Sequence, residues 1–138
     1  MPLTGKLKPM VAAAVVLVAA AAGLYYWSRP PVRTEPLVRV VVPELTELGR
    51  RGEKAFEAYC AECHGRNAAG SDRGPPLVHQ IYRPNHHADI AFARAARFGV
   101  RQHHWFFGDM PPRPEVSDED IVAIVRYVRE LQRANGIR

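Results

Sequence analysis

The chain has 138 residues, of which 47% are hydrophobic and 24% charged, so it has the make-up of one modest globular domain with an appendage and not of a disordered chain. The net charge is +5, but residues 45–138 hold 14 basic and 12 acidic side chains, a balance of only +2. Domains that bind nucleic acid carry a clear basic excess, so we do not expect a nucleic-acid partner.

The first predicted element is an uncharged helix over residues 10–27, MVAAAVVLVAAAAGLYYW. As a helix it would extend about 27 Å, close to the thickness of the apolar core of a bilayer. Lysines precede it and aromatic residues close it, as in an inserted helix. A signal peptide cleaved after Ala22 also fits this segment. We favour a retained membrane anchor over residues 1–27, and both alternatives place the rest of the chain outside the cytoplasm.

Residues 28–44 contain four prolines and predict an extended linker, after which a domain covers residues 45–138. We expect helices over residues 46–60 and 86–98, the second stopped by Gly99. A third helix follows Ser117, an N-cap residue, with apolar residues at helical spacing up to Leu131. Residues 65–84 and 100–116 are rich in loop-forming residues, and no alternating strand pattern is present. The domain is therefore predicted to be all-α, with about three main helices.

The only two cysteines of the chain stand in CAECHG, residues 60–65. Cys-x-x-Cys-His is the attachment signature of c-type haem. Two thiols at this spacing on a helical turn can form thioethers with the two vinyl groups of one porphyrin, and the imidazole of His64 then faces the iron. A buried porphyrin would also supply apolar surface to a domain whose own core is thin.

Two other chemistries use paired cysteines. A structural zinc site needs four ligands, usually from a second Cys/His pair, and no other cysteine exists. A redox dithiol is expected within a βαβ pattern, which is missing here. Both alternatives are therefore weaker than a haem.

An iron bound by one histidine has a further axial position. Met110 stands in FFGDMPPRP, a loop stiffened by proline, and this context favours a ligand over core packing. We expect the remaining histidines to be solvated or to contact a haem propionate, in preference to forming a second metal site. They are His79, His86, His87, His103 and His104. If Met110 faces elsewhere, the haem would have an open position for a ligand.

The ordered motifs of residues 46–138 resemble a small monohaem cytochrome c of the Met/His type, common in bacteria. The resemblance rests on Gly52-x-x-x-Phe56-x-x-x-Cys60-x-x-Cys63-His64, on Gly74-Pro75-x-Leu77, on Gly99, on Met110-Pro111, and on a last helix with Ile124 and Tyr127. It implies a cytochrome c fold around one covalent haem c. It also implies that Gly52 and Phe56 pack against Tyr127 where the first and last helices of the domain cross.

The resemblance further implies a role for each site residue. Cys60 and Cys63 carry the thioethers, and His64 and Met110 are the axial ligands of the iron. The carbonyl of Pro75 accepts a hydrogen bond from His64. Leu77 and Trp105 line the haem, with Trp105 or Arg101 available to a propionate. The role of the segment 100–109, VRQHHWFFGD, stays open.

The expected function is single-electron transfer between protein redox partners at the periplasmic side of an inner membrane, with no substrate pocket and no catalysis by the chain itself. Two alternatives stay open. The chain can be the cytochrome subunit of a larger dehydrogenase or oxidase, or a haem-based gas sensor with a labile Met110 ligand. A zinc-stabilised binding module is the remaining alternative outside haem chemistry.

Overall fold

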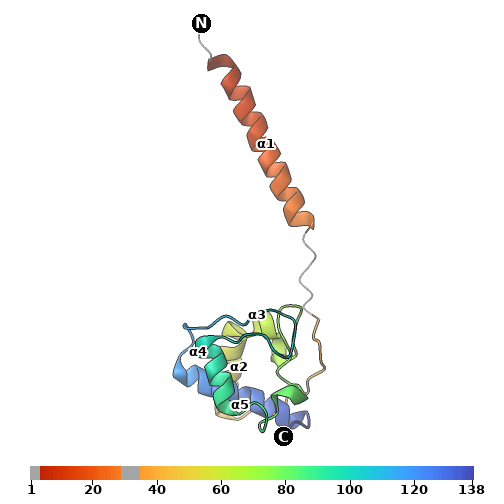
Figure 1. The fold of residues 1–138 in the computed structure, drawn as a ribbon, viewed down its shortest axis with the longest axis vertical. Coiled ribbons are helices and arrows are strands. Elements are labelled where there is room, and N and C mark those ends of the chain that lie inside the picture. Colours follow the sequence, from red (N-terminus) through yellow and green to blue (C-terminus); the bar gives the residue numbers. More distant parts are fainter. Residues whose placement is uncertain (1–3, 29–34) are drawn as a thin grey trace. The chain divides into compact units, whose positions relative to one another are not determined.

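The structure, a computed structural model, describes residues 4–28 and 35–138, which fall into two separate units. The first unit consists of helix α1 (Thr4–Ser28), as Figure 1 shows. Among the described residues, no helix combines the length and the apolar character that crossing a membrane requires, so the predicted transmembrane helix finds no support.

Residues 35–44 form neither helix nor strand, and residues 29–34 of the predicted linker lie outside the described residues. The later part of this segment is bonded to the domain. Val38 N–H donates to Ala69 O at 3.1 Å. The side chain of Asn135 accepts from Val41 N and donates to Val41 O, at 2.9 and 2.8 Å. Residues 38–41 therefore lie against the domain, bonded at Val38 to the loop of Ala69 and at Val41 to Asn135, just after the last helix.

The domain is built on the crossing of α2 (Glu47–Tyr59) and α5 (Asp118–Ala134). The hydroxyls of Thr46 and Ser117 cap these helices by accepting from backbone N–H groups in the first turn. At the crossing, a Cβ on Gly52 would stand 1.9 Å from the carbonyl oxygen of Ala123. Only glycine allows this approach, and the rings of Phe56 and Tyr127 then pack with centroids 5.6 Å apart. The predicted contact of these helices is confirmed.

Shorter elements complete the domain. Helix α3 (Ala61–His64) is one turn, η1 (Arg66–Ala68) and η2 (Gln80–Tyr82) are 3₁₀ turns, and α4 (Asp89–Phe98) is the third main helix. Helix α4 ends at Gly99, whose φ of +73° suits a residue without Cβ. The described residues contain no strand, and Val100 and Met110 form one isolated antiparallel bridge. The all-α prediction is confirmed.

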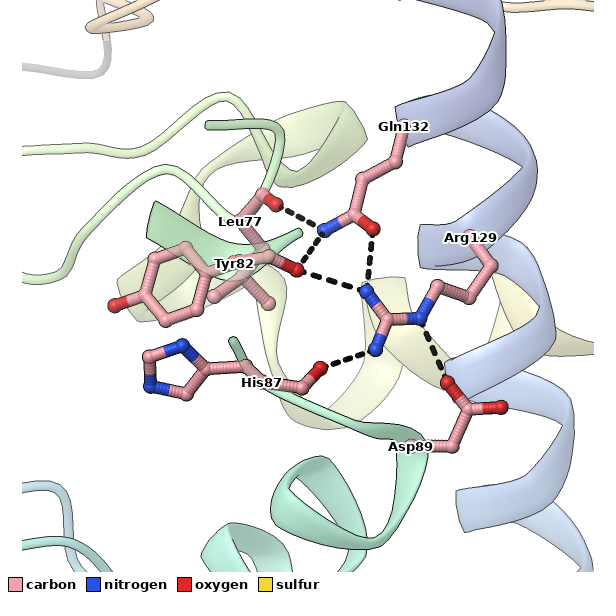
Figure 2. A network of polar contacts seen from close by, with 6 residues as sticks. All are labelled: Leu77, Tyr82, His87, Asp89, Arg129 and Gln132. Carbon is pink, nitrogen blue, oxygen red and sulfur yellow. Dashed lines mark hydrogen bonds and ion pairs between the residues drawn. The ribbon is translucent and has the colours of Figure 1, made fainter. Parts of the chain in front are cut away.

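A buried network ties α5 to the loop before α4 (Figure 2). The guanidinium of Arg129, only 6% exposed, donates to the carbonyls of Tyr82 and His87 and pairs with Asp89. Gln132, fully buried, accepts from Arg129 and donates to the carbonyl oxygens of residues 77 and 82. These bonds satisfy carbonyls that no helix uses, so they fix the backbone of residues 77–89.

Candidate haem site

The two cysteines lie at the junction of α2 and α3. Cys60 is both the C-cap residue of α2 and the N-cap residue of α3, and Cys63 follows one turn later within α3. Both thiols are free, and no disulfide joins them. Burial raises the pKa of the Cys60 thiol to about 11, with the nearby Arg113 opposing the rise. Cys60 therefore stays protonated at neutral pH.

The imidazole of His64 is held in one orientation. It is 9% exposed, and its Nδ1 lies 2.9 Å from the carbonyl oxygen of Pro75. A carbonyl can only accept, so Nδ1 carries the proton and Nε2 has the free lone pair. Burial lowers the pKa of His64, although the Pro75 bond acts in the opposite direction. The ring is thus a neutral imidazole with Nε2 available to a metal.

The loop after His64 holds Pro75 in place. Ser71 Oγ donates to Cys63 O at 2.5 Å, and Leu77 N–H donates to Ala68 O at 2.9 Å. A Cβ on Gly74 would stand 2.8 Å from Cys63 O, so this loop passes directly over the cysteine turn. The Gly74-Pro75 pair therefore brings a carbonyl to His64.

A cavity of about 540 Å³ adjoins this turn. It has the size of a small-molecule or cofactor site. Six of the predicted site residues line it: Cys60, His64, Pro75, Leu77, Trp105 and Met110. Cys63 and Arg101 are not part of the lining, and Arg101 is exposed. The predicted contact of Arg101 with a propionate stays a prediction.

Met110 is positioned by backbone contacts on both sides. Its N–H and C=O exchange hydrogen bonds with Val100, both at 2.9 Å. A Cβ on Gly99 would stand 2.5 Å from Met110 O, so the end of α4 and the methionine loop touch. Three residues on, Arg113 N–H donates to Ala96 O at 2.7 Å and its guanidinium donates to Tyr59 O at 2.7 Å. The methionine is thereby fixed between α4 and α2.

Two buried nitrogens of the cavity wall, Trp105 Nε1 and Arg113 Nε, form no hydrogen bond of good geometry within the described residues, although Arg113 Nε lies 3.0 Å from Glu115 Oε1. Burial raises the pKa of Tyr82, and the Trp105 indole nearby lowers it in part. A ligand with an oxygen acceptor would satisfy the Trp105 N–H. A porphyrin with carboxylate groups fits the cavity in this respect, as it fits the paired thiols and the neutral imidazole.

Sequence reasoning missed several wall residues. Arg113 is the most informative, because it both lines the cavity and anchors the methionine loop. Its position directly after Met110-Pro111-Pro112 could have indicated that it lies near the predicted methionine ligand. Tyr82, Phe92 and Val100 also line the cavity, and nothing in their sequence context marked them.

A cysteine pair, a buried neutral imidazole and an adjoining apolar cavity in an all-α domain define a protein that attaches haem covalently. The chain belongs to the cytochrome c family, whose model matches residues 49–132, well over half of the chain. No curated protein matches the chain. The cofactor is a covalent c-type haem, in agreement with the spacing of Cys60 and Cys63.

Proposed function

We propose that this cytochrome c is a single-electron carrier whose haem is attached through Cys60 and Cys63 and ligated by His64 and Met110. The observation that carries the proposal is that His64 and Met110 line the same cavity and are each held by backbone hydrogen bonds. When bound, the haem supplies an iron that gains and loses one electron.

Each residue has a separate task in this proposal. The cysteines prevent loss of the cofactor, and the carbonyl of Pro75 keeps the proton of His64 on Nδ1. The bridge to Val100 and the contacts of Arg113 hold the Met110 thioether in the wall of the cavity. A ligand set that does not rearrange suits electron transfer, because little structural change accompanies each electron. Trp105 Nε1 would donate to a propionate.

We further propose that its partners are redox proteins and that the domain works outside the cytoplasm, where c-type haem is attached in bacteria. Cell fractionation and the mass of the mature protein test this placement. The same mass shows whether residues 1–27 are retained. Recovery of haem-loaded protein only from the cytoplasm would contradict it.

A potentiometric titration followed by absorbance tests the carrier function. We expect one reversible transition that fits the Nernst equation for one electron. The haem should be low-spin with the same ligands in the oxidised and the reduced protein. A change of spin state between the oxidised and reduced protein would favour a ligand-binding haem. Co-purification from native membranes distinguishes a free carrier from a subunit of a larger enzyme.

A further inference from the structure

Four histidines from two distant segments meet at the rim of the haem cavity. His86 and His87 precede α4, and His103 and His104 lie in the loop after it. His86, His87 and His104 each offer a ring nitrogen, and these nitrogens all lie within 4.8 Å of one another. The ring of His103 lies 4.3 Å from that of His104, between centroids. No local pattern in the sequence predicts that these pairs meet.

Two of the rings already have the tautomer that metal ligands use. Nδ1 of His87 lies 2.8 Å from Ile81 O, and Nδ1 of His103 lies 2.9 Å from Arg101 O. Since a carbonyl only accepts, each Nδ1 carries the proton and each Nε2 keeps its lone pair. A backbone acceptor behind the ring is the usual support of a metal-binding histidine.

Both segments that carry the histidines are held by side chains. On the first, the carbonyl of His87 accepts from Arg129, within the buried network of Figure 2. On the second, Gln102 N–H donates to Asp109 Oδ1 at 2.9 Å, and Gly108 N–H donates to Gln102 Oε1 at 3.0 Å. These hydrogen bonds hold the two sides of the loop of residues 102–109 together. The backbone that carries the four histidines is therefore fixed by hydrogen bonds in both segments.

We propose that His86, His87 and His104 bind a divalent transition-metal ion of the zinc, copper or nickel class, with His103 close enough to be a fourth ligand. Imidazole suits these ions. Zinc–nitrogen bonds of about 2.0–2.1 Å in a tetrahedron need nitrogens about 3.3 Å apart. The exposed rings of His86 and His104 can close the remaining distance by rotating.

One ring of the cluster, His104, has a lowered pKa. Desolvation, and then the neighbouring His103, His87 and His86, lower the pKa of His104. A neutral imidazole is the ligating form of histidine. No residue of the CAECHG turn takes part in this second site, although His87, His103 and His104 line the same cavity.

The test is calorimetric titration of the tag-free, haem-loaded full chain with zinc chloride near neutral pH. Haem loading keeps Cys60, Cys63 and His64 from contributing. We expect one zinc ion per chain, and about tenfold or greater loss of affinity in the double variant His86→Gln/His104→Gln. Titration with Cu²⁺ should show nitrogen hyperfine coupling in electron paramagnetic resonance, which is absent from the double variant.

His79→Asn is the matched control. His79 stands outside the cluster and caps η2 by accepting from Ile81 N–H at 3.2 Å, which asparagine can also do. It should bind zinc as the unaltered chain does. An unchanged haem spectrum shows that a variant is folded, and the single variant His104→Gln replaces the double one if that spectrum changes. Absence of zinc binding, or equal affinity in the cluster variant, would overturn the proposal.

Discussion

At the scale of single residues, Cys60 and His64 of CAECHG have properties that disfavour thiol exchange and favour metal ligation. A thiol whose pKa is about 11 has little thiolate at neutral pH, so Cys60 is a poor nucleophile for disulfide exchange. The neutral ring of His64, with its proton on the side of Pro75, is a preformed ligand. The environment of these residues thus agrees with the haem motif and not with thiol exchange.

Substitution of Met110 tests its role as a ligand. Met110→Ala should abolish the weak thioether-to-iron absorption band of the oxidised protein. It should also lower the reduction potential on the order of 0.1 V, because methionine raises the potential within the span of about 0.8 V that axial ligands cover. Absorption spectroscopy and potentiometry measure the two effects.

The control for this substitution is Phe106→Ala, since Phe106 is fully exposed in the same loop. It should change neither the band nor the potential. An unaltered thioether band in Met110→Ala would show that another residue ligates the iron.

Local motifs were the part of the site that sequence could predict. The contact of Pro75 with His64 follows from a short motif, and the structure contains it. The predicted contact of Arg101 with a propionate stays a prediction, since Arg101 lies outside the cavity lining. Which arginine faces the cavity depends on how the loop of residues 100–109 folds back, and that is set by contacts such as the one between Gln102 and Asp109. Arg113 lines the cavity, and Arg101 does not.

At the scale of elements, the crossing of α2 and α5 holds the domain together. Gly52→Ala should destabilise the folded state by about 2–3 kcal/mol, because the added Cβ would stand 1.9 Å from a backbone oxygen that cannot move alone. Urea unfolding followed by circular dichroism measures this. The neighbouring exposed substitution Arg51→Ala should stay within about 0.5 kcal/mol of the unaltered protein. Equal stability of both variants would mean that the helices do not cross here.

The start of α2 is tied to α5 through a buried carboxylate. Glu130 accepts from the backbone N–H and the hydroxyl of Thr46, at 3.0 and 2.6 Å, and pairs with Arg126. Burial raises the pKa of Glu130, but these hydrogen bonds outweigh burial and leave it below its usual value of 4.5. The ionised form is therefore bound more tightly in the folded protein than in the unfolded chain.

This contact predicts a pH dependence of stability. A lowered folded-state pKa contributes stability that is fully present above pH 4.5 and is lost as the pH falls through the folded value. Glu130→Gln should lower the free energy of unfolding at neutral pH by about 1–2 kcal/mol and flatten its acid dependence. Urea midpoints measured from neutral to acid pH give both. Glu119→Gln, exposed on the same helix, is the control, and an equally steep acid loss in both variants would contradict the assignment.

Helices were well predicted because their signals are local, although α4 begins at Asp89 and not at residue 86. Ser117 caps α5 and Gly99 ends α4, as their residue types indicate. The segment of residues 38–41 was expected to be a tether. Its hydrogen bonds to Asn135 join positions 94 residues apart, and no local pattern shows such pairing. The cluster of four histidines could not be predicted either, because its two pairs come from separate segments of the chain.

At the scale of the whole molecule, the core is divided. One apolar cluster lies around Phe56, Tyr127 and Leu131, and a second, smaller one around Val116, Ile121 and Val125. The haem cavity is lined by residues of both, among them Phe56 and Ile121. Phe92 and Ile124 pack against both clusters. A bound haem would add apolar surface between them, which a domain of this size needs for stability.

The divided core predicts that folding depends on the haem. The double variant Cys60→Ala/Cys63→Ala, prepared without cofactor, should lose most of the domain's helical signal in far-ultraviolet circular dichroism. The haem-loaded full chain is the reference. A helical spectrum and cooperative unfolding in the cofactor-free variant would show that the polypeptide forms the fold alone.

We propose that one covalent haem with a histidine and a methionine ligand makes this chain an electron carrier. The most direct test is the absorption spectrum of the full chain, oxidised and reduced, before and after addition of carbon monoxide. We predict a sharp reduced α-band of the c type, a weak thioether-to-iron band in the oxidised form, and no prompt change with carbon monoxide. A high-spin spectrum that shifts promptly with carbon monoxide, or no haem absorption at all, would contradict the account.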